Sequence, residues 1–362
     1  PEAEQGLNVG RVASQIAGFP VDVTGATVNR FCASGLEAIA QSAMRVMSGW
    51  SDIVIGGGLE SMSYVPMGGN LPRPHPEYTK KLADLYASMG ITAENVASRY
   101  SVSREDQDRY AAESYRRTLA SIHSGKFQDE IVPVSIPQRK GDPVVFSQDE
   151  CPRETSYELM AKMKPAFQKD GFATAGNASI ISDGAAAVVV MSREKAEELG
   201  CSILATIGAQ ASAGLDMKYV LVAPILAIPK CLQKEGISRD DVDLFEINEA
   251  FSGSTVAVLK ELNLNPGKVN VNGGSVALGH PIGASGCRVL VTLLNEMIKQ
   301  DKKTGLASLC LGGGEAVAMV VKRKTMAENR AAWITFIACW FVDGMASQPR
   351  SWLEFIVSDQ CT

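Results

Sequence analysis

The sequence predicts an α/β protein made of two similar halves, with a long segment inserted into the first half. The chain has 362 residues, of which 46% are hydrophobic, and its many Ala, Gly and Val residues suit buried sheets. Strand and helix patterns alternate near its start and through its second half, and one motif occurs in both halves. A chain of this length is too long for one small core, so two or three domains are expected.

The first half opens with a helix and then alternates. "EQGLNVGRVASQIA", residues 4–17, has its apolar residues roughly on one side and predicts an amphipathic helix. "GATVNRF", residues 25–31, predicts a strand. A helix is expected from Ser34, because Ser34 and Glu37 have the spacing of a capping box. "SDIVIGGGLE", residues 51–60, predicts a short buried strand that runs into a glycine turn.

The inserted segment covers residues 61–182. It is richer in Pro, Met and charge and has short helical patterns such as 103–122, so we expect an excursion from the sheet. "DGAAAVVVMS", residues 183–192, predicts an apolar strand that returns to it. From residue 203 the strand and helix patterns alternate again, in "ILATIGAQ", 224–235, "VDLFEINEAF", 251–262, "KVNVNGG", 283–299 and "GLASLCLGGGEAVAMVVKR".

Composition excludes several classes of protein. A net charge of −5 gives no general reason to bind nucleic acid or an anionic membrane. The eight cysteines contain no CxxC pair and no signal peptide precedes them, so we expect reduced thiols in an intracellular compartment, and neither a disulfide framework nor a zinc site. No apolar run is long enough to span a bilayer. The cytoplasm is the expected location, with an organelle left open.

Cys32 stands where a predicted strand becomes a predicted helix, in "VNRFCASG". Taken alone, a single cysteine favours packing, since free Cys behaves as a small buried hydrophobe. The alternative is a nucleophile whose thiolate is stabilised by a helix N-terminus.

An internal repeat favours the nucleophile. "VNRFCASGLEAIAQSAMRVM" in the first half matches "VNVNGGSVALGHPIGASGCRVLVTLLNEM" in the second, and each is followed by a strand that ends in GGG. A duplicated α/β unit brings equivalent helix N-termini together at a pseudo-twofold axis. The counterpart of Cys32 then contributes His280, and the strand after it contributes Cys310.

Four motifs come in a fixed order: "VNRFCASG", "NEAF" at 248–251, "GGSVALGHPIGASG" at 273–286 and "CLGGGEA" at 310–316. Together they strongly resemble the thiolase family of acyl-CoA acetyltransferases. "GGLESMS", "MGITAENVA" and "KPAFQKDGFATAGNAS" extend the resemblance, which covers residues 1 to about 323. It implies layered αβαβα halves, a loop domain inserted in the first, and acyl transfer.

The resemblance implies a role for five residues. Cys32 resembles the nucleophile. A free thiol has a pKa of about 8.5, and a helix N-terminus together with a nearby imidazole lowers this pKa by roughly a unit or more. His280 resembles the base that takes its proton, and Cys310 resembles a second acid/base. Asn248 would hold a water that joins His280 in one oxyanion hole, and the backbone N–H groups of Cys32 and Gly312 would form the other.

Each of these residues also has a structural reading. A lone His is usually a core histidine, but glycines flank His280 and would let a ligand approach. Cys310 is otherwise a buried strand cysteine. The structural reading of "NEAF" is a helix cap followed by a solvated acid. Asn248 can be such a cap and also hold the catalytic water. Glu249 is expected to give structural support and not to act as the base.

Coenzyme A is expected as a substrate, with no permanently bound cofactor and no metal. By resemblance, Ser179 contacts the pantetheine arm, Arg153 lies near the nucleotide, and Met89 and Phe251 lie near the acyl group. Ordinary packing, or a solvated surface charge, is the competing reading for each. His75 and His123 are read as surface residues.

Some residues depart from the family pattern. Ser88 stands where short-chain biosynthetic relatives commonly have His, Val220 replaces a pocket methionine and Ala223 a glycine, and Ile180 replaces a usual glycine. These changes alter the pocket wall, so the acyl chain length and the direction of flux stay open.

The ends of the chain also depart from the pattern. The resemblance begins at the second helix of the family, so two strands and the first helix of the first half are absent. We therefore expect residues 1–362 alone not to form a stable, active enzyme. Residues 324–362 hold three of the four tryptophans. They read as an interfacial anchor, a partner-binding segment or a tail without a selected role, and the abrupt change of composition favours the last.

The sequence therefore predicts four parts: residues 1–60 with 183–193, the loop domain 61–182, the second half 194–323 and the tail 324–362. The predicted activity is acyl transfer between coenzyme A and 3-ketoacyl-CoA in fatty acid and lipid metabolism, through an acyl-cysteine, in a homodimer or homotetramer. Two rivals stay open. One is a decarboxylating condensing enzyme, which typically uses a Cys-His-His or Cys-His-Asn site. The other is an inactive lipid-binding or scaffold fragment.

Overall fold

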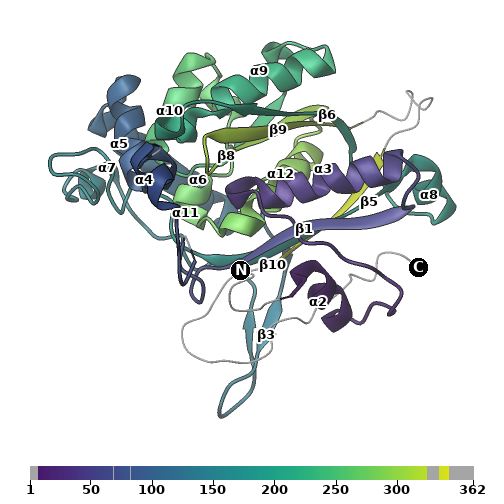
Figure 1. Cartoon of the computed structure of the whole chain (residues 1–362). Coiled ribbons are helices and arrows are strands. Elements are labelled where there is room, and N and C mark those ends of the chain that lie inside the picture. The colour runs from purple at the N-terminus through teal and green to yellow at the C-terminus, as the bar shows by residue number, and fades with distance from the viewer. Residues whose placement is uncertain (1–6, 68, 82, 324–333, 342–362) are drawn as a thin grey trace.

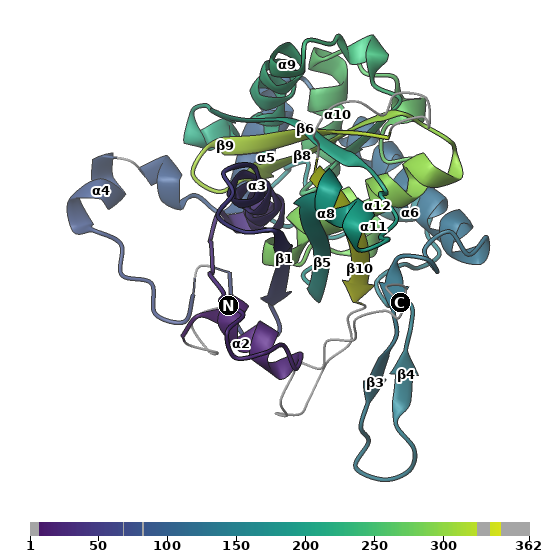
Figure 2. The same ribbon diagram turned by 90° about the vertical axis from the view of Figure 1, so that its right-hand side faces the viewer.

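The computed structural model describes residues 7–67, 69–81, 83–323 and 334–341. Figures 1 and 2 show its layers. Helices α9 (Pro224–Glu235) and α10 (Ser252–Glu261) cover the strands of the second half, α3 (Ser34–Met47) and α12 (Ile282–Lys299) lie in the middle, the strands of the first half follow, and α2 (Val9–Ile16) lies beyond them. This arrangement confirms the layered αβαβα fold.

The remaining elements of the first half and its insertion are η1 (Phe31–Ala33), β1 (Ile53–Ser61), α4 (Pro76–Lys81), η2 (Ala83–Tyr86), α5 (Met89–Arg99), α6 (Arg104–His123), β2 (Ile131–Val132), β3 (Val134–Ile136), β4 (Val144–Phe146), α7 (Tyr157–Met160) and β5 (Asp183–Ser192). Those that follow are α8 (Arg193–Glu198), β6 (Thr206–Gly214), η3 (Met217–Val222), η4 (Arg239–Asp241), β7 (Leu244–Ile247), η5 (Pro266–Lys268), α11 (Ser275–Leu278), β8 (Thr304–Leu311), β9 (Glu315–Lys322) and β10 (Ile334–Phe341).

The strands follow the order β1-β5-β10-β6-β9-β8-β7. β1 pairs antiparallel with β5, so the insertion leaves and re-enters the sheet between two neighbouring strands. In the second half, β9 lies antiparallel between β6 and β8, and β7 pairs parallel with β8. β3 and β4 form a separate hairpin, which projects from the body in Figure 2.

Small residues bring the two middle helices together. Gly35 and Gly286 are the glycines of the repeated Ala-Ser-Gly triplets. A Cβ on Gly35 would lie 2.5 Å from the backbone N of Cys287, and one on Gly286 would lie 2.4 Å from the backbone N of Leu36. Only glycine permits this approach, so the repeat seen in the sequence marks the crossing of α3 and α12.

β10 comes from the tail. It pairs antiparallel with β5 along its whole length and touches β6 at Thr335 and Thr206. β10 therefore has the same place next to β5 in the first half that β6 has next to β9 in the second half. The rest of the tail, 324–333 and 342–362, lies outside the described residues, as do residues 1–6. The four proposed parts of the chain, and the instability expected of residues 1–362 alone, stay predictions.

Two predicted strands are wrong. Residues 25–30 form no strand, because the start of α2 takes their polar groups: Asn8 Nδ2 donates to Gly25 O at 2.7 Å, and Thr27 Oγ1 donates to Asn8 Oδ1 at 2.7 Å. "KVNVNGG" contributes only isolated bridges, between Phe245 and Val269 and between Val271 and Gly273.

The capping box at Ser34 is also wrong. Ser34 is itself the first residue of α3, and its hydroxyl donates to Phe31 O at 2.7 Å, while Glu37 pairs with Arg30. The turn η1 occupies the place of the expected cap.

Candidate active site

Cys32 lies in η1, immediately before α3, and this turn packs against β8 and α12. Phe31 has a φ of +47° and turns its ring onto Gly312, where a Cβ would lie 3.1 Å from the ring. Gly312 opens the turn between β8 and β9, and Gly313 and Gly314 follow with φ of +89° and +91°, which suits glycine. The turn that carries Cys32 therefore meets the turn that follows Cys310.

His280 lies just before α12 and is buried, with 7% of its surface exposed. Its Nδ1 is 2.6 Å from Ser285 Oγ, and its Nε2 is 3.4 Å from Asn248 Nδ2. Asn248 Oδ1 accepts from Ser275 Oγ at 2.6 Å. The two polar candidates thus form one hydrogen-bonded group.

The backbone joins this group to the cysteines. Asn248 N donates to Ser308 O at 3.0 Å, two residues before Cys310 on β8. Cys310 itself is 3% exposed. Cys32 and Cys310 interact electrostatically, and η1 meets the turn that Gly312 opens. Asn248 and His280 form a hydrogen-bonded pair, which the backbone anchors to β8 two residues before Cys310.

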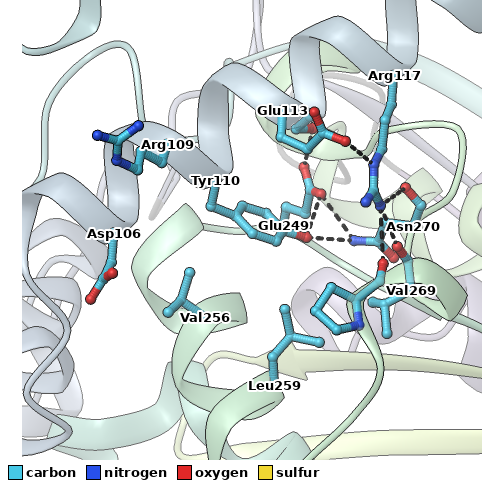
Figure 3. A pocket seen from close by; sticks show the side chains of 12 residues that line it. Asp106, Arg109, Tyr110, Glu113, Arg117, Glu249, Val256, Leu259, Val269 and Asn270 are labelled. Carbon is cyan, nitrogen blue, oxygen red and sulfur yellow. Dashed lines mark hydrogen bonds and ion pairs between the residues drawn. The ribbon is translucent and has the colours of Figure 1, made fainter. Parts of the chain in front are cut away.

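Glu249 is fully buried and ties the insertion to this site. Its carboxylate accepts from Tyr110 Oη at 2.9 Å, Ser114 Oγ at 2.7 Å, Asn270 Nδ2 at 3.0 Å and the backbone N of Val276 at 3.2 Å. Figure 3 shows Glu249 held between Tyr110 and Asn270. With all these donors engaged, the geometry supports the structural role expected for Glu249.

A cavity of about 290 Å³ lies behind Glu249, between α6 and α10. Val256 and Leu259 give it an apolar wall, and its lining residues do not include Cys32, His280 or Cys310. Arg117 at its rim pairs with Glu113 and donates to the carbonyl groups of Pro266, Val269 and Asn270. The polar groups of this cavity therefore hold the loop that carries Asn270, and the cavity lies away from the cysteines.

Burial controls the titration of the site. It raises the pKa of Cys32, with further contributions from Cys310 and Glu60, and it raises the pKa of Cys310 to about 12. It lowers the pKa of His280 to about 4, and Arg288 adds to this effect. The expected lowering of the Cys32 pKa is therefore wrong for the unliganded protein. The cost of burying a thiolate beside two other acidic groups exceeds any benefit from the helix N-terminus.

Three of the four candidates for coenzyme A lie near "NEAF". Ser179 N donates to Ala250 O at 3.1 Å, and its neighbour Ala178 bridges to Phe251. Phe251 packs edge-to-face on Phe167 at 5.9 Å, and Phe167 covers Gly90, next to Met89.

The fourth candidate, Arg153, is exposed, and its guanidinium lies 5.5 Å from the centroid of the Tyr115 ring. His75 and His123 are exposed, as expected.

The sequence interpretation missed three residues of the site: Ser275, Ser285 and Phe167. Each lies within a quoted motif, but its contact depends on the fold. The spacing of Ser285, five residues after His280 and inside the first turns of a helix, was the one local signal for its contact.

Within the described part of the chain, no group of three or more His, Cys, Asp or Glu residues could hold a metal ion. No helix there has the length and apolar character needed to cross a membrane.

The comparison with family models decides the family. Residues 1–194 match the model of the thiolase N-terminal domain, and residues 201–323 match that of the thiolase C-terminal domain. The chain belongs to the thiolase family. This thiolase is therefore an acyltransferase enzyme.

Named relatives agree. The thiolase is 48% identical to an acetyl-CoA acetyltransferase of Pseudomonas aeruginosa, over 89% of this chain and 85% of the relative. It is 44% identical to a 3-ketoacyl-CoA thiolase of Bacillus subtilis, over 88% and 84%.

Solved structures show the same fold. The acetyl-CoA acetyltransferase of Bacillus anthracis superimposes with a TM-score of 0.80 at 44% identity, covering 88% of this chain and 84% of that one. Human mitochondrial 3-ketoacyl-CoA thiolase gives 0.79 at 34% identity, covering 87% and 83%.

Proposed function

We propose that this thiolase transfers acyl groups between coenzyme A and 3-ketoacyl-CoA through an acyl-thioester on Cys32. The observation that carries the proposal is that η1 with Cys32 meets the turn after Cys310, while the hydrogen-bonded pair of Asn248 and His280 is anchored to the same strand through Ser308. The names of the relatives support the same substrate class, since they include acetyl-CoA acetyltransferases and a 3-ketoacyl-CoA thiolase.

Acylation begins with a protonated thiol and a neutral imidazole, given the raised pKa of Cys32 and the lowered pKa of His280. His280 takes the thiol proton as the sulfur attacks the 3-keto carbon of the substrate. The attack converts that carbonyl oxygen into an oxyanion, and the N–H groups of Cys32 and Gly312 are the proposed donors to it. Moving the proton during the attack avoids a free thiolate in the buried site.

Collapse of this intermediate breaks the bond between C2 and C3. The acyl group stays on Cys32, and the electron pair goes to the enolate of acetyl-CoA. Burial keeps Cys310 protonated, with a pKa of about 12, so it can give its proton to C2. Asn248 and His280 are the proposed partners of the enolate oxygen. The sulfur of coenzyme A then attacks acyl-Cys32 and gives its proton to the Cys310 thiolate. The bond between the acyl carbon and Cys32 breaks, the shortened acyl-CoA leaves, and His280 returns its proton to the Cys32 sulfur.

The same geometry supports the proposed substrate contacts. Ser179 lies beside "NEAF" for the pantetheine arm, Met89 and Phe251 form an apolar wall with Phe167, and Arg153 is the surface cation for the nucleotide. Comparing the turnover of acetoacetyl-CoA with that of longer 3-ketoacyl-CoA substrates measures the preference for acyl chain length. The homodimer or homotetramer and the compartment stay predictions.

Trapping of the acyl-enzyme tests this function. Incubation with acetyl-CoA, followed by acid quench and peptide mass spectrometry, should place one acetyl group on Cys32. Cys32→Ala should form no acyl-enzyme. Cys310→Ala should accept the acetyl group but lose carbon–carbon chemistry by about 10²- to 10⁴-fold, the usual contribution of a general acid or base. Cys201→Ala, which changes a cysteine outside the cluster, serves as the matched control.

Two results would reject the proposal. Turnover that survives in Cys310→Ala would remove its acid/base role. The absence of acyl-Cys32 in the folded protein would favour the lipid-binding or scaffold alternative. A decarboxylating activity on carrier-protein thioesters would instead support the condensing-enzyme rival.

A further inference from the structure

Ser285 is a buried residue in contact with the His280 ring. It is 1% exposed, lies in the first turns of α12, and contacts the Nδ1 face of the His280 ring at 2.6 Å. Its hydroxyl also lies 2.9 Å from the carbonyl oxygen of Pro281. These two contacts determine which way the hydrogen bonds run.

A carbonyl oxygen can only accept a hydrogen bond, and a serine hydroxyl has one hydrogen to donate. Ser285 Oγ therefore donates to Pro281 O. The remaining contact, with His280, then requires Ser285 Oγ to accept and His280 Nδ1 to carry the proton. A neutral ring with its proton on Nδ1 has its lone pair on Nε2.

The other side of the ring agrees with this assignment. Nε2 faces Asn248 Nδ2 at 3.4 Å, and an amide NH₂ group can only donate. In this structure Asn248 Oδ1 accepts from Ser275 Oγ at 2.6 Å, which leaves Nδ2 facing the ring. With this amide orientation, a ring protonated on Nδ1 satisfies every hydrogen bond from Ser275 to Pro281.

We propose that Ser285 is a positioning residue, which holds the proton of His280 on Nδ1 and so keeps Nε2 unprotonated. Nε2 faces Asn248 Nδ2 at 3.4 Å, and its lone pair takes the Cys32 proton once this long contact gives way. The proposal rests on the proposed function for its kinetic consequence, because a base must have a free lone pair on the side of its substrate. The tautomer itself is a property of the unliganded protein and can be measured without turnover.

Nitrogen-15 NMR of the full chain labelled in histidine measures the tautomer directly. The protein has only three histidines, and His75→Gln and His123→Gln assign the two exposed ones. At neutral pH, His280 should show a protonated Nδ1 and an unprotonated Nε2. Ser285→Ala should shift this ring toward the other tautomer or a mixture. A proton on Nε2 in the unmodified protein would overturn the proposal.

Kinetics provide the second readout. Ser285→Ala should slow acetylation of Cys32 by about 10- to 100-fold, with a much smaller change in the KM for acetyl-CoA, since the base loses its orientation and the substrate contacts stay. Ser285→Thr keeps the hydroxyl and should restore most of the rate. The start of α12 should survive in both variants, because Pro281 O also accepts from the backbone N of Ala284 at 3.0 Å and of Ser285 at 2.8 Å.

The outcomes separate the two proposals. If no acyl-enzyme forms in the unmodified protein, the proposed function fails and the NMR result still decides the tautomer. If acylation occurs on Cys32 while Ser285→Ala leaves both tautomer and rate unchanged, the positioning role is wrong and the proposed function stands. Ser285→Thr gives a further test of the hydroxyl. If this variant melts like the unmodified protein but is slow and has the altered tautomer, the proposed role of the hydroxyl is wrong.

Discussion

Cys32 and His280 are both uncharged at neutral pH, and the reason is burial. The pKa of the thiol is raised and that of the imidazole is lowered, so each stays uncharged at neutral pH. A cysteine–histidine ion pair would need the opposite shifts. The sequence places a thiol at a helix N-terminus but does not show how deeply it is buried.

Alkylation distinguishes the neutral pair from an ion pair. Iodoacetamide reacts with the thiolate, so its rate with Cys32 should rise roughly a hundredfold from pH 6 to pH 8, because the thiolate fraction rises tenfold per unit below the pKa. Peptide mapping follows Cys32, with Cys32→Ala to identify its peptide. Acetyl-CoA should protect it. A rate that is level across this range would indicate a preformed thiolate.

Glu130 shows the same effect on a carboxyl group. It is 4% exposed, accepts from Thr292 Oγ1 at 2.9 Å, and burial raises its pKa to about 7. A raised pKa in the folded state means that the folded state binds the proton more tightly. The stability gained from this proton is complete below the ordinary value of 4.5 and is lost as the pH rises through 7.

Glu130→Gln should therefore stabilise the protein at high pH only. The amide oxygen can still accept from Thr292, and the variant has no charge to bury. We expect little change in the free energy of unfolding at pH 5 and a gain of up to roughly 3 kcal/mol at pH 9. Urea unfolding at both values measures it. Asp129→Asn, at a side chain 70% exposed, should change stability little at either pH. Equal effects of Glu130→Gln at pH 5 and pH 9 would contradict the assignment.

At the scale of elements, the crossing of α3 and α12 sets the spacing of the site. η1 and Cys32 precede α3, and His280 precedes α12. Gly35 and Gly286 let the backbones approach at the crossing. The crossing at these two glycines therefore sets how closely η1 and the start of α12 approach each other.

Gly286→Ala tests this dependence. Its Cβ would lie 2.4 Å from the backbone N of Leu36, and backbone atoms cannot rotate away. We expect a loss of about 1–3 kcal/mol of stability, as for other overpacked sites, and slower acylation of Cys32. Gly214→Ala is the matched control, because its nearest atom would be 3.6 Å away. Urea unfolding and the acyl-enzyme assay measure both variants; normal acylation in Gly286→Ala would show that the helices can separate without moving the site.

Periodicity predicted most elements well. The strand 183–192 and the helix 224–235 have the predicted bounds, and α6 and α12 differ by one or two residues. It failed where a segment lacks a partner strand. "GATVNRF" has the composition of a strand, but its polar groups bind the start of α2. Motifs identified Cys32, His280, Cys310 and Asn248 as candidates, whereas the contact of Ser285 with His280 arises only when α12 forms behind the ring.

At the scale of the molecule, β10 joins the two halves. The change of composition after residue 323 favoured a tail with no selected role, yet residues 334–341 pair with β5 and touch β6. A strand between two others satisfies backbone groups on both of its neighbours. The position of β10 beside β5 repeats that of β6 beside β9, so each half has a strand at the equivalent place.

Two truncations test the contribution of β10. Ending the chain after Arg323 removes it, and ending it after Phe341 keeps it. The shorter chain should lose several kcal/mol of stability, since each ladder hydrogen bond contributes about 1 kcal/mol. Hydrogen exchange should also become faster in β5, at those amides of residues 185–192 that face β10. The chain that ends after Phe341 should retain both the stability and the protection. If the two truncated chains unfold at the same urea concentration and exchange β5 at the same rate, β10 does not complete the sheet in solution.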